Sequence, residues 1–385
     1  MLMKTKNFFL IVATTMGLAL TGEMMTSCAN QDNPIDVPDV MLPPGTQTVD
    51  ISKLESNYVA KDGDVLTGTL DGSKQPYMIS IAEGATVVLS NAIIKRDNTK
   101  NYSWAGITCL GDATIILDGE NSVEGFDRDY PGIQPGPEDT TLTIKGEGKL
   151  SASSGAAGIG SGYNISCGNI LIEGGDITVT GGAAGIGCGG GASGVSACGD
   201  ITITGGTIVA TGEGGAGIGS GDGFDGTNVC GDITITGGIV TATGGGNGTG
   251  IGSGNCGTCG DIIITGGTVI AMGEGNGAGI GCGGGRDDYP SFCGDITIES
   301  GEGFVSVTAI KGGRAHRPIG VSSNEKDCNT CGNITFNSES INNFGDYLGY
   351  RPKAGYYDGL ILTISSSDPD DPEKENDTWT LTPAY

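Results

Sequence analysis

The sequence predicts an all-β protein, a single-domain right-handed parallel β-helix of about nine or ten coils, from two motifs that recur in phase. A Gly-Ile pair returns at intervals of roughly 26 to 33 residues, and a Cys-Gly-Asp/Asn-Ile motif returns with a similar period. The isoleucines of the first motif are Ile107, Ile133, Ile159, Ile186, Ile218, Ile251 and Ile280. The cysteines of the second are Cys167, Cys198, Cys230, Cys259, Cys293 and Cys331. A period of this size is typical of a solenoid.

Each repeat also contains strand-like alternation that ends in a pair of glycines. Ile201-Thr-Ile-Thr-Gly-Gly206 is one example, and similar stretches begin at Ile233 and Ile262. Apolar residues at every second position indicate half-buried strands, and the glycines allow a corner into the next strand. Units stacked at about 4.8 Å per rung would enclose a continuous aliphatic interior. Parallel crossovers are almost always right-handed, which gives the predicted hand.

The first residues resemble a bacterial lipoprotein signal peptide, assigned to 1–27. Lys4 and Lys6 precede an apolar run at 8–20, which is shorter than the roughly 20 residues that a bilayer span needs. The Met-Thr-Ser-Cys sequence that ends at Cys28 resembles a lipobox, so we expect lipidation of Cys28 and membrane attachment through the lipid alone. An ordinary signal peptide followed by a chance cysteine is the alternative.

The remaining chain divides into three predicted parts. Residues 28–46 are polar, acidic and interrupted by proline, which predicts a tether. The β-helix is predicted over 47–340. Beyond it the repeat pattern fades, and 341–385 is predicted to cap the open end of the solenoid, because such an end is an exposed sheet edge.

The charge balance narrows the class of partners. The chain carries 45 acidic and 19 basic residues, for a net charge of −26. Nucleic acid is therefore not expected as a partner, since phosphate binding requires clustered Lys and Arg. The acidity fits a soluble surface protein, which we expect to be a monomer, and would also attract divalent cations.

Twelve cysteines leave eleven if Cys28 is lipidated, an odd number that cannot pair completely within the chain. The repeat predicts a column of cysteines that fills a small apolar slot at one corner. Two pairs within single coils, Cys188 with Cys198 and Cys282 with Cys293, are the predicted candidates for disulfides.

A column of acidic and amide residues follows the same repeat. Its members are Asn169, Asp200, Asp232, Asp261, Asp295 and Asn333. We interpret each side chain as a turn cap that accepts a backbone N–H, a role that Asp and Asn share. The alternative is a calcium site at Asp200, Asp232, Asp261 and Asp295, because stacked carboxylates repel one another unless a cation is bound. No other cofactor is predicted.

Loops of variable length follow each Gly-Ile-Gly sequence, and such loops usually carry the binding residues of a solenoid. Aromatic rings beside carboxylates suit sugars, whose C–H faces stack and whose hydroxyls donate hydrogen bonds. The candidate ligand-binding residues are Tyr102, Trp104, Tyr163, Asp222, Phe224, Asp225, Asp287, Asp288 and Tyr289. The alternative interpretation is that these side chains simply cover the loops.

Three sequence phrases carry a resemblance to a known family, and the first of them is Ile107-Thr-Cys-Leu-Gly-Asp-Ala-Thr-Ile-Ile-Leu117. Ala157-Gly-Ile-Gly-Ser-Gly162 and Cys198-Gly-Asp-Ile-Thr-Ile-Thr-Gly-Gly206 resemble the Gly-rich β-helix lipoproteins of gut Bacteroidetes, described as carbohydrate-binding-domain-containing proteins. The resemblance covers roughly 47–340. It implies an outer-membrane lipoprotein, exposed at the cell surface, that binds a glycan or another host or bacterial surface component. It implies no catalytic residues.

Three functions remain open from the sequence. The favoured one is a non-catalytic carbohydrate-binding or adhesive lipoprotein. The second is a polysaccharide lyase or hydrolase, which is disfavoured because Arg286 is the one basic residue between 150 and 300 and His316 is the one histidine. A hydrolase would also need a suitably spaced pair of carboxylates. The third is a structural protein or an adhesin directed at host proteins.

Overall fold

The computed structural model describes residues 46–191, 194–223, 228–285, 288–301, 304–321, 330–337, 339–340, 354–357, 360–365 and 378–384. The chain divides into two compact units, Met1–Met41 and Leu42–Tyr385, and every described residue belongs to the second. The predicted signal peptide, Cys28 and nearly all of the predicted tether lie outside the described residues. Within the described part, no helix is long and apolar enough to cross a membrane.

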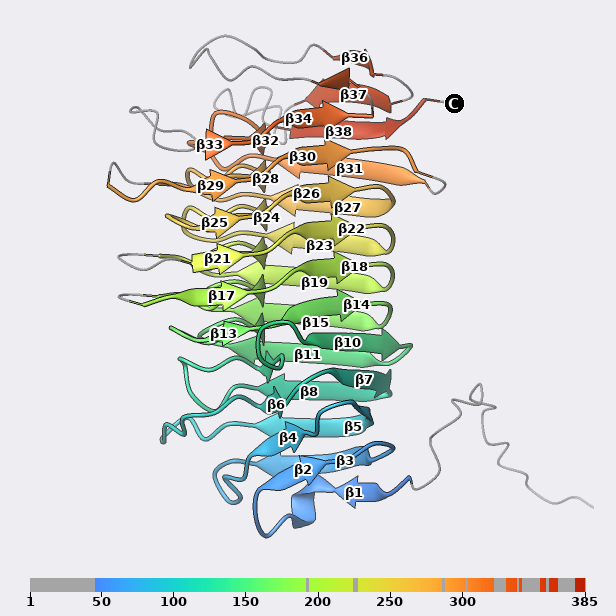
Figure 1. Ribbon diagram of the computed structural model, residues 1–385, viewed down its shortest axis with the longest axis vertical. Coiled ribbons are helices and arrows are strands. Elements are labelled where there is room, and N and C mark those ends of the chain that lie inside the picture. The colour runs from blue at the N-terminus through green and yellow to red at the C-terminus, as the bar shows by residue number, and fades with distance from the viewer. Residues whose placement is uncertain are drawn as a thin grey trace, which may run out of the picture. The chain divides into compact units, whose positions relative to one another are not determined.

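The second unit is a right-handed parallel β-helix, as predicted (Figure 1). A typical coil contains β14 (Asn169–Ile172), β15 (Asp176–Gly181), β16 (Ile186–Gly187) and β17 (Ser196–Cys198), after which β18 (Ile201–Ile203) pairs in parallel with β14. Tight glycine corners join β14-type to β15-type strands, whereas longer loops project on the side of β17 (Figure 1).

The coils form three sheets among the described residues. The 22-stranded sheet contains both long strands of each coil. Its other members are β1 (Thr48–Asp50), β3 (Val65–Asp71), β5 (Ala85–Lys95), β7 (Ala113–Asp118), β8 (Glu120–Glu124), β10 (Thr141–Gly146), β11 (Lys149–Ser154), β19 (Thr207–Gly212), β22 (Ile233–Ile235), β23 (Ile239–Thr243), β26 (Ile262–Ile264), β27 (Gly267–Met272), β30 (Ile296–Ile298), β31 (Val305–Ile310), β34 (Ile334–Phe336), β35 (Glu339–Ser340), β36 (Gly355–Tyr357), β37 (Leu360–Ser365) and β38 (Thr378–Pro383).

The two smaller sheets carry the two sequence motifs. The ten-stranded sheet holds the Gly-Ile motif and contains, besides β16, β2 (Tyr58–Ala60), β4 (Ile79–Ile81), β6 (Ile107–Cys109), β9 (Ile133–Gln134), β12 (Ile159–Gly160), β20 (Ile218–Gly219), β24 (Ile251–Gly252), β28 (Ile280–Gly281) and β32 (Ile319–Gly320). The six-stranded sheet holds the Cys-Gly motif and contains, besides β17, β13 (Ser166–Cys167), β21 (Asn228–Cys230), β25 (Thr258–Cys259), β29 (Phe292–Cys293) and β33 (Thr330–Cys331). One short 3-10 helix, η1 (Ile51–Lys53), lies at the N-terminal end of the stack.

In each repeat, apolar residues that point into the interior alternate with threonines that point to the surface. In β18 and β19, Ile201, Ile203 and Ile208 are fully buried, while the threonines between them face outward. Because the coils stack in register, isoleucine lies on isoleucine, as in the pairing of Ile201 with Ile233. Burial of each such side chain contributes about 1.5–3 kcal/mol, so the columns of the interior stabilise the fold.

Glycine in the Gly-Ile-Gly sequence is required by the close approach of successive coils. Gly219 has a φ of +136°, and an added Cβ would overlap the carbonyl oxygen of Gly252 in the next coil. Only glycine adopts this backbone conformation freely and leaves room for the neighbouring strand. The recurrence of the motif therefore follows from the stacking itself.

The C-terminal strands extend the stack with the opposite strand direction. β38 pairs antiparallel with β31, and β37 pairs antiparallel with β38. Leu381 and Leu362 on these strands are buried with the core, so the described part of 341–385 covers the interior.

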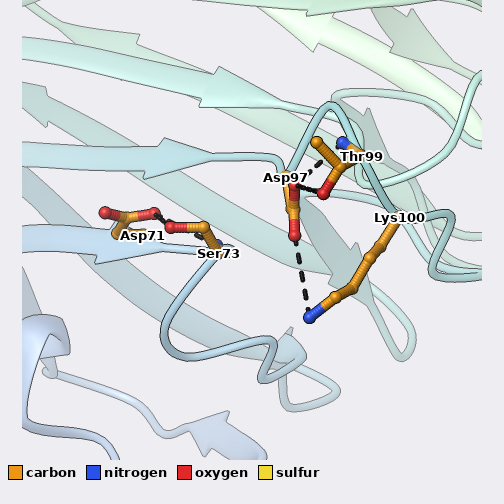
Figure 2. A network of polar contacts seen from close by, with 5 residues as sticks. All are labelled: Asp71, Ser73, Asp97, Thr99 and Lys100. Carbon is orange, nitrogen blue, oxygen red and sulfur yellow. Dashed lines mark hydrogen bonds and ion pairs between the residues drawn. The ribbon is translucent and has the colours of Figure 1, made fainter.

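Three turns near the N-terminal end, which begin at Asp50, Asp71 and Asp97, share a motif that is not among the predicted ones. Asp71 accepts hydrogen bonds from the backbone N–H and hydroxyl of Ser73, at 3.1 and 2.6 Å. Asp97 binds Thr99 in the same way at 2.8 and 2.6 Å, and Lys100 Nζ lies 3.9 Å from its other oxygen (Figure 2). These hydrogen bonds, led by the two hydroxyls, lower the pKa of both carboxyls.

Candidate functional site

The acidic column is a ladder of hydrogen bonds between successive coils. Each Asn or Asp side chain accepts the backbone N–H of the residue in the same position one coil later, at 2.6 to 2.8 Å. The acceptors are Asn169, Asp200, Asp232, Asp261 and Asp295. The predicted role as an N–H acceptor is therefore present, but the donor belongs to the next coil and not to the side chain's own turn.

The glycine of the Cys-Gly-Asp sequence makes room for this ladder. An added Cβ at Gly231 would overlap Oδ1 of Asp200, which lies in the coil below. The glycine and the aspartate of the motif thus act together, because the glycine leaves room for the carboxylate that accepts the N–H of the following aspartate. Among the described residues, no group of three acidic, cysteine or histidine side chains is arranged to hold a metal ion.

The cysteines form the predicted column inside the six-stranded sheet. Cys167, Cys198, Cys230, Cys259, Cys293 and Cys331 pair in register from coil to coil. All six are buried, in agreement with a small apolar slot. Another buried cysteine, Cys109, lies on β6 of the ten-stranded sheet, and its burial raises its pKa to about 12.

A second column of small side chains follows the Gly-Ile-Gly sequence, and it holds serine in some coils and cysteine in others. Ser161, Ser220 and Ser253 each accept a glycine N–H of the next coil, at 2.9 to 3.0 Å. Cys188 and Cys282 take the equivalent places, and their thiols donate to the carbonyl oxygens of Val229 and Thr330 at 2.8 and 3.0 Å. No disulfide joins the ten described cysteines, so Cys188–Cys198 and Cys282–Cys293 remain predicted pairs.

Tyr102 and Trp104 form an aromatic cluster with Phe126, a residue that sequence reasoning missed. The rings of Tyr102 and Trp104 stack with centroids 5.0 Å apart, and that of Phe126 lies 5.8 Å from Trp104. Phe126 is fully buried, and the other two rings are partly buried against the core. The cluster therefore contributes to packing, and only part of each predicted binding ring faces solvent.

Tyr163 and Asp222 are brought close together from different loops. The backbone N–H of Tyr163 donates to Asp129 O at 2.8 Å, and its ring covers Gly190, where a Cβ would lie 2.8 Å from the ring. Burial raises the pKa of Tyr163, with the carboxylates of Asp129 and Asp222 adding to the effect and Arg128 opposing it. The ring of Tyr163 thus lies against Gly190, and the N–H of the adjacent Gly191 donates to Asp222 O at 3.3 Å.

Two polar contacts extend this arrangement along the stack. Arg128 Nε lies 3.3 Å from Asp129 Oδ1, and both side chains are exposed. Asn255 Nδ2 donates to Asp222 Oδ1 at 2.9 Å and thereby fixes the orientation of that carboxylate. We call Arg128, Asp129, Tyr163, Asp222 and Asn255 the loop strip.

The other predicted ligand-binding residues are not part of the loop strip. Asp288 and Tyr289 are exposed on a later loop, with Tyr289 at 43 %. Phe224, Asp225 and Asp287 lie outside the described residues. Arg128, Asp129 and Asn255 were missed because they belong to no repeated motif, although their positions in loops could have indicated them.

A shallow depression lies elsewhere, beside the start of β7 and β10 and next to Gly84, which precedes β5. Its volume is about 290 Å³, and it is lined by Gly84, Asp112, Ala113, Thr114, Thr141 and Thr143. Asp112 Oδ1 accepts the N–H of Thr141 at 2.7 Å, so a carboxylate also accepts a backbone N–H of the next coil in this earlier part of the stack. Its carboxylate is thus engaged in structure.

Comparison with known proteins agrees with this architecture. The family model described as "Beta helix repeat" matches residues 142–163, 170–190, 201–222 and 262–284. No curated protein matches the chain, and no solved structure does. Each matched segment contains a Gly-Ile-Gly strand together with the preceding long strands. The chain is a parallel β-helix protein built from β-helix repeats.

Proposed function

We propose that the protein is a cell-surface lipoprotein, attached through Cys28, with a non-catalytic carbohydrate-binding or adhesive role. The observation that carries this proposal is the loop strip. Residues from loops that are distant in the sequence bring the ring of Tyr163 against Gly190, and backbone hydrogen bonds tie Tyr163 to Asp129 and the next residue, Gly191, to Asp222.

The chemistry of the loop strip suits a sugar. A tyrosine ring offers an apolar surface to the C–H face of a pyranose, and ionised carboxylates accept hydrogen bonds from sugar hydroxyls. Asn255 holds Asp222 in place, so part of the entropy cost of ordering the side chain is met before binding. The parallel β-helix fold is itself compatible with adhesive and polysaccharide-related roles, although fold alone does not determine function.

Affinity electrophoresis through gels that contain a soluble polysaccharide tests the role of the loop strip. Tyr163→Ala should lower the apparent affinity for the polysaccharide at least tenfold, which is seen as reduced retardation in the gel. Tyr163→Phe should keep most of the affinity because the ring remains. Asp222→Asn should weaken binding, while Glu213→Gln, at an exposed acid outside the strip, serves as the matched control. Equal retardation of all four variants would exclude the loop strip as a glycan site.

A further inference from the structure

Cys188 and Cys282 occupy equivalent places in two coils of the stack. Each directly follows a Gly-Ile-Gly strand, β16 in one case and β28 in the other, and each side chain is fully buried. In three other coils the same place holds a serine, namely Ser161, Ser220 or Ser253. Because serine fits this place, the two cysteines are not required by the packing of the stack.

Both thiols reach the next coil of the stack. Cys188 Sγ donates to Val229 O at 2.8 Å, and Cys282 Sγ donates to Thr330 O at 3.0 Å. Val229 and Thr330 each directly precede the Cys-Gly motif cysteine of that next coil. The same contact therefore occurs twice, in parts of the chain that are distant in sequence.

These two motif cysteines, Cys230 and Cys331, also contact the thiols that reach them. The thiols of Cys188 and Cys230 are hydrogen-bonded to each other, and so are those of Cys282 and Cys331. All four side chains belong to the buried core. Each pair thus brings two sulfurs together from successive coils.

The contacts within a single coil are less uniform. Cys188 meets Cys198 of its own coil at the backbone N–H of Cys198. Cys282 contacts the thiol of Cys293, which belongs to its own coil, as well as that of Cys331. A thiol of the next coil is therefore the partner that both places have in common.

Neighbours within the motif column are less well placed for a bond with each other. Register pairs join Cys198 to Cys230 and Cys293 to Cys331. Equivalent side chains of in-register parallel strands are separated by the rung spacing of about 4.8 Å, whereas the Cβ atoms of a disulfide lie about 3.8 Å apart. A cysteine from outside the column approaches from another direction and is free of this constraint.

We propose that oxidation joins Cys188 to Cys230 and Cys282 to Cys331, so that two disulfides connect successive coils. This inference goes beyond the proposed carbohydrate-binding role and names other partners than the within-coil pairs predicted from the sequence. The loops that the bonds close are long, since Val229 and Thr330 already lie 41 and 48 residues beyond the two cysteines. Closure of such loops restricts the unfolded chain, and disulfides persist in exported proteins.

Each bond forms by exchange with an oxidant that is itself a disulfide, such as oxidised glutathione. Two thiols lose two protons and two electrons to form one S–S bond, and the oxidant accepts them and leaves as two thiols. Burial raises the pKa of Cys188 and Cys282, so the reactive thiolate is scarce once the coils have closed. Formation therefore accompanies folding, before the thiols are fully buried.

Refolding of the full chain with reduced and oxidised glutathione, followed by alkylation of free thiols in denaturant, tests the proposal. Cleavage before aspartate residues places Cys230 and Cys331 on different peptides from Cys188 and Cys282. Mass spectrometry should find one linked peptide pair for each bond, and fragmentation of the linked peptides should identify the joined cysteines. Both linked pairs should disappear after reduction.

Serine variants provide matched controls, because serine already fills the place of Cys188 in other coils. Cys188→Ser should raise the alkylated fraction of Cys230 at least tenfold. Cys198→Ser, which removes a thiol of the same coil, should leave the link to Cys230 intact. Cys282→Ser and Cys293→Ser test the second bond in the same way.

Three other results would each overturn the proposal. Links from Cys188 to Cys198, or from Cys282 to Cys293, would establish the within-coil pairs instead. Links between neighbours of the motif column would show that the rung spacing permits a bond there. Alkylation of every cysteine without prior reduction would show that the column stays reduced. Glycan binding by the loop strip is measured separately and is independent of all three.

Discussion

The carboxylate of Asp200 accepts the backbone N–H of Asp232 at 2.8 Å, and Asp232 lies at the equivalent position one coil later. The same bond recurs from Asp232 to Asp261 and from Asp261 to Asp295. A column that resembles a row of metal ligands or catalytic acids in the sequence thus connects the coils. Asn169 at the first position preserves this function, since its amide oxygen accepts the N–H of Asp200, and Asn333 at the last position donates its own N–H to Asp295.

Replacement of Asp232 tests the ladder. Asp232→Ala removes the acceptor of the Asp261 N–H, and a hydrogen bond of this kind contributes about 1 kcal/mol, so exchange of that amide should accelerate about fivefold. Asp232→Asn should leave the rate near that of the wild-type protein. Hydrogen exchange followed by NMR measures both. Because the ladder needs no cation, EDTA should not change the rate, and a marked acceleration in EDTA would instead support the calcium alternative.

Gly219 should be among the least replaceable residues of the stack. A Cβ there overlaps Gly252 O and the φ of +136° is strained for other residues, so Gly219→Ala should cost about 3 kcal/mol or more. The corresponding fall in Tm is at least about 5 °C, measured by circular dichroism. At Gly313 an added Cβ meets nothing within 4 Å, and Gly313→Ala is the control. Similar Tm values for the two variants would contradict the proposed packing.

Asp50 should titrate far below an ordinary aspartate. Hydrogen bonds from Ser52, together with Lys53, lower its pKa to about 2. Because the folded pKa is depressed, the stabilisation is complete above about pH 4 and is lost as the pH falls towards 2. NMR titration of the side-chain carboxyl measures this pKa. Ser52→Ala should raise it towards 3.8, and an unchanged value would show that the hydroxyl is not responsible.

Cys109 should be inert to thiol reagents in the folded protein. Its side chain is buried, and burial raises its pKa to about 12, so the thiolate that reacts is nearly absent at pH 8. Labelling with a maleimide, followed by mass spectrometry of the Cys109 peptide, should show modification only after denaturation. Rapid labelling of the native protein would contradict the buried position.

The repeated motifs made the solenoid predictable. Gly-Ile-Gly and Cys-Gly-Asp report close contacts that every coil must make, so Gly219 and Asp232 have recognisable counterparts along the chain. Such periodicity does not reveal which coil supplies a bonding partner, and the donor to Asp200 was therefore assigned to the wrong turn. Phe126 and Asn255 were missed because they occur once, in loops that obey no period.

The outward positions of the long strands illustrate a second limit. Alternation identified Ile208 and Val240 as interior residues, but the outward residues between them received no role because a surface position seldom affects folding. The continuation of this side of the sheet from Thr308 to Thr380 depends on an antiparallel pairing between β31 and β38, which are distant in sequence. Only the assembled sheet brings these positions into one column.

Equilibrium binding of the Leu42–Tyr385 unit to an array of neutral and acidic glycans, with analysis of any product released, tests the central claim most directly. The account predicts saturable binding to a defined class of glycan with no product formed. The absence of binding to every glycan would contradict a carbohydrate-binding role, and release of a shortened or unsaturated product would show that the protein is an enzyme.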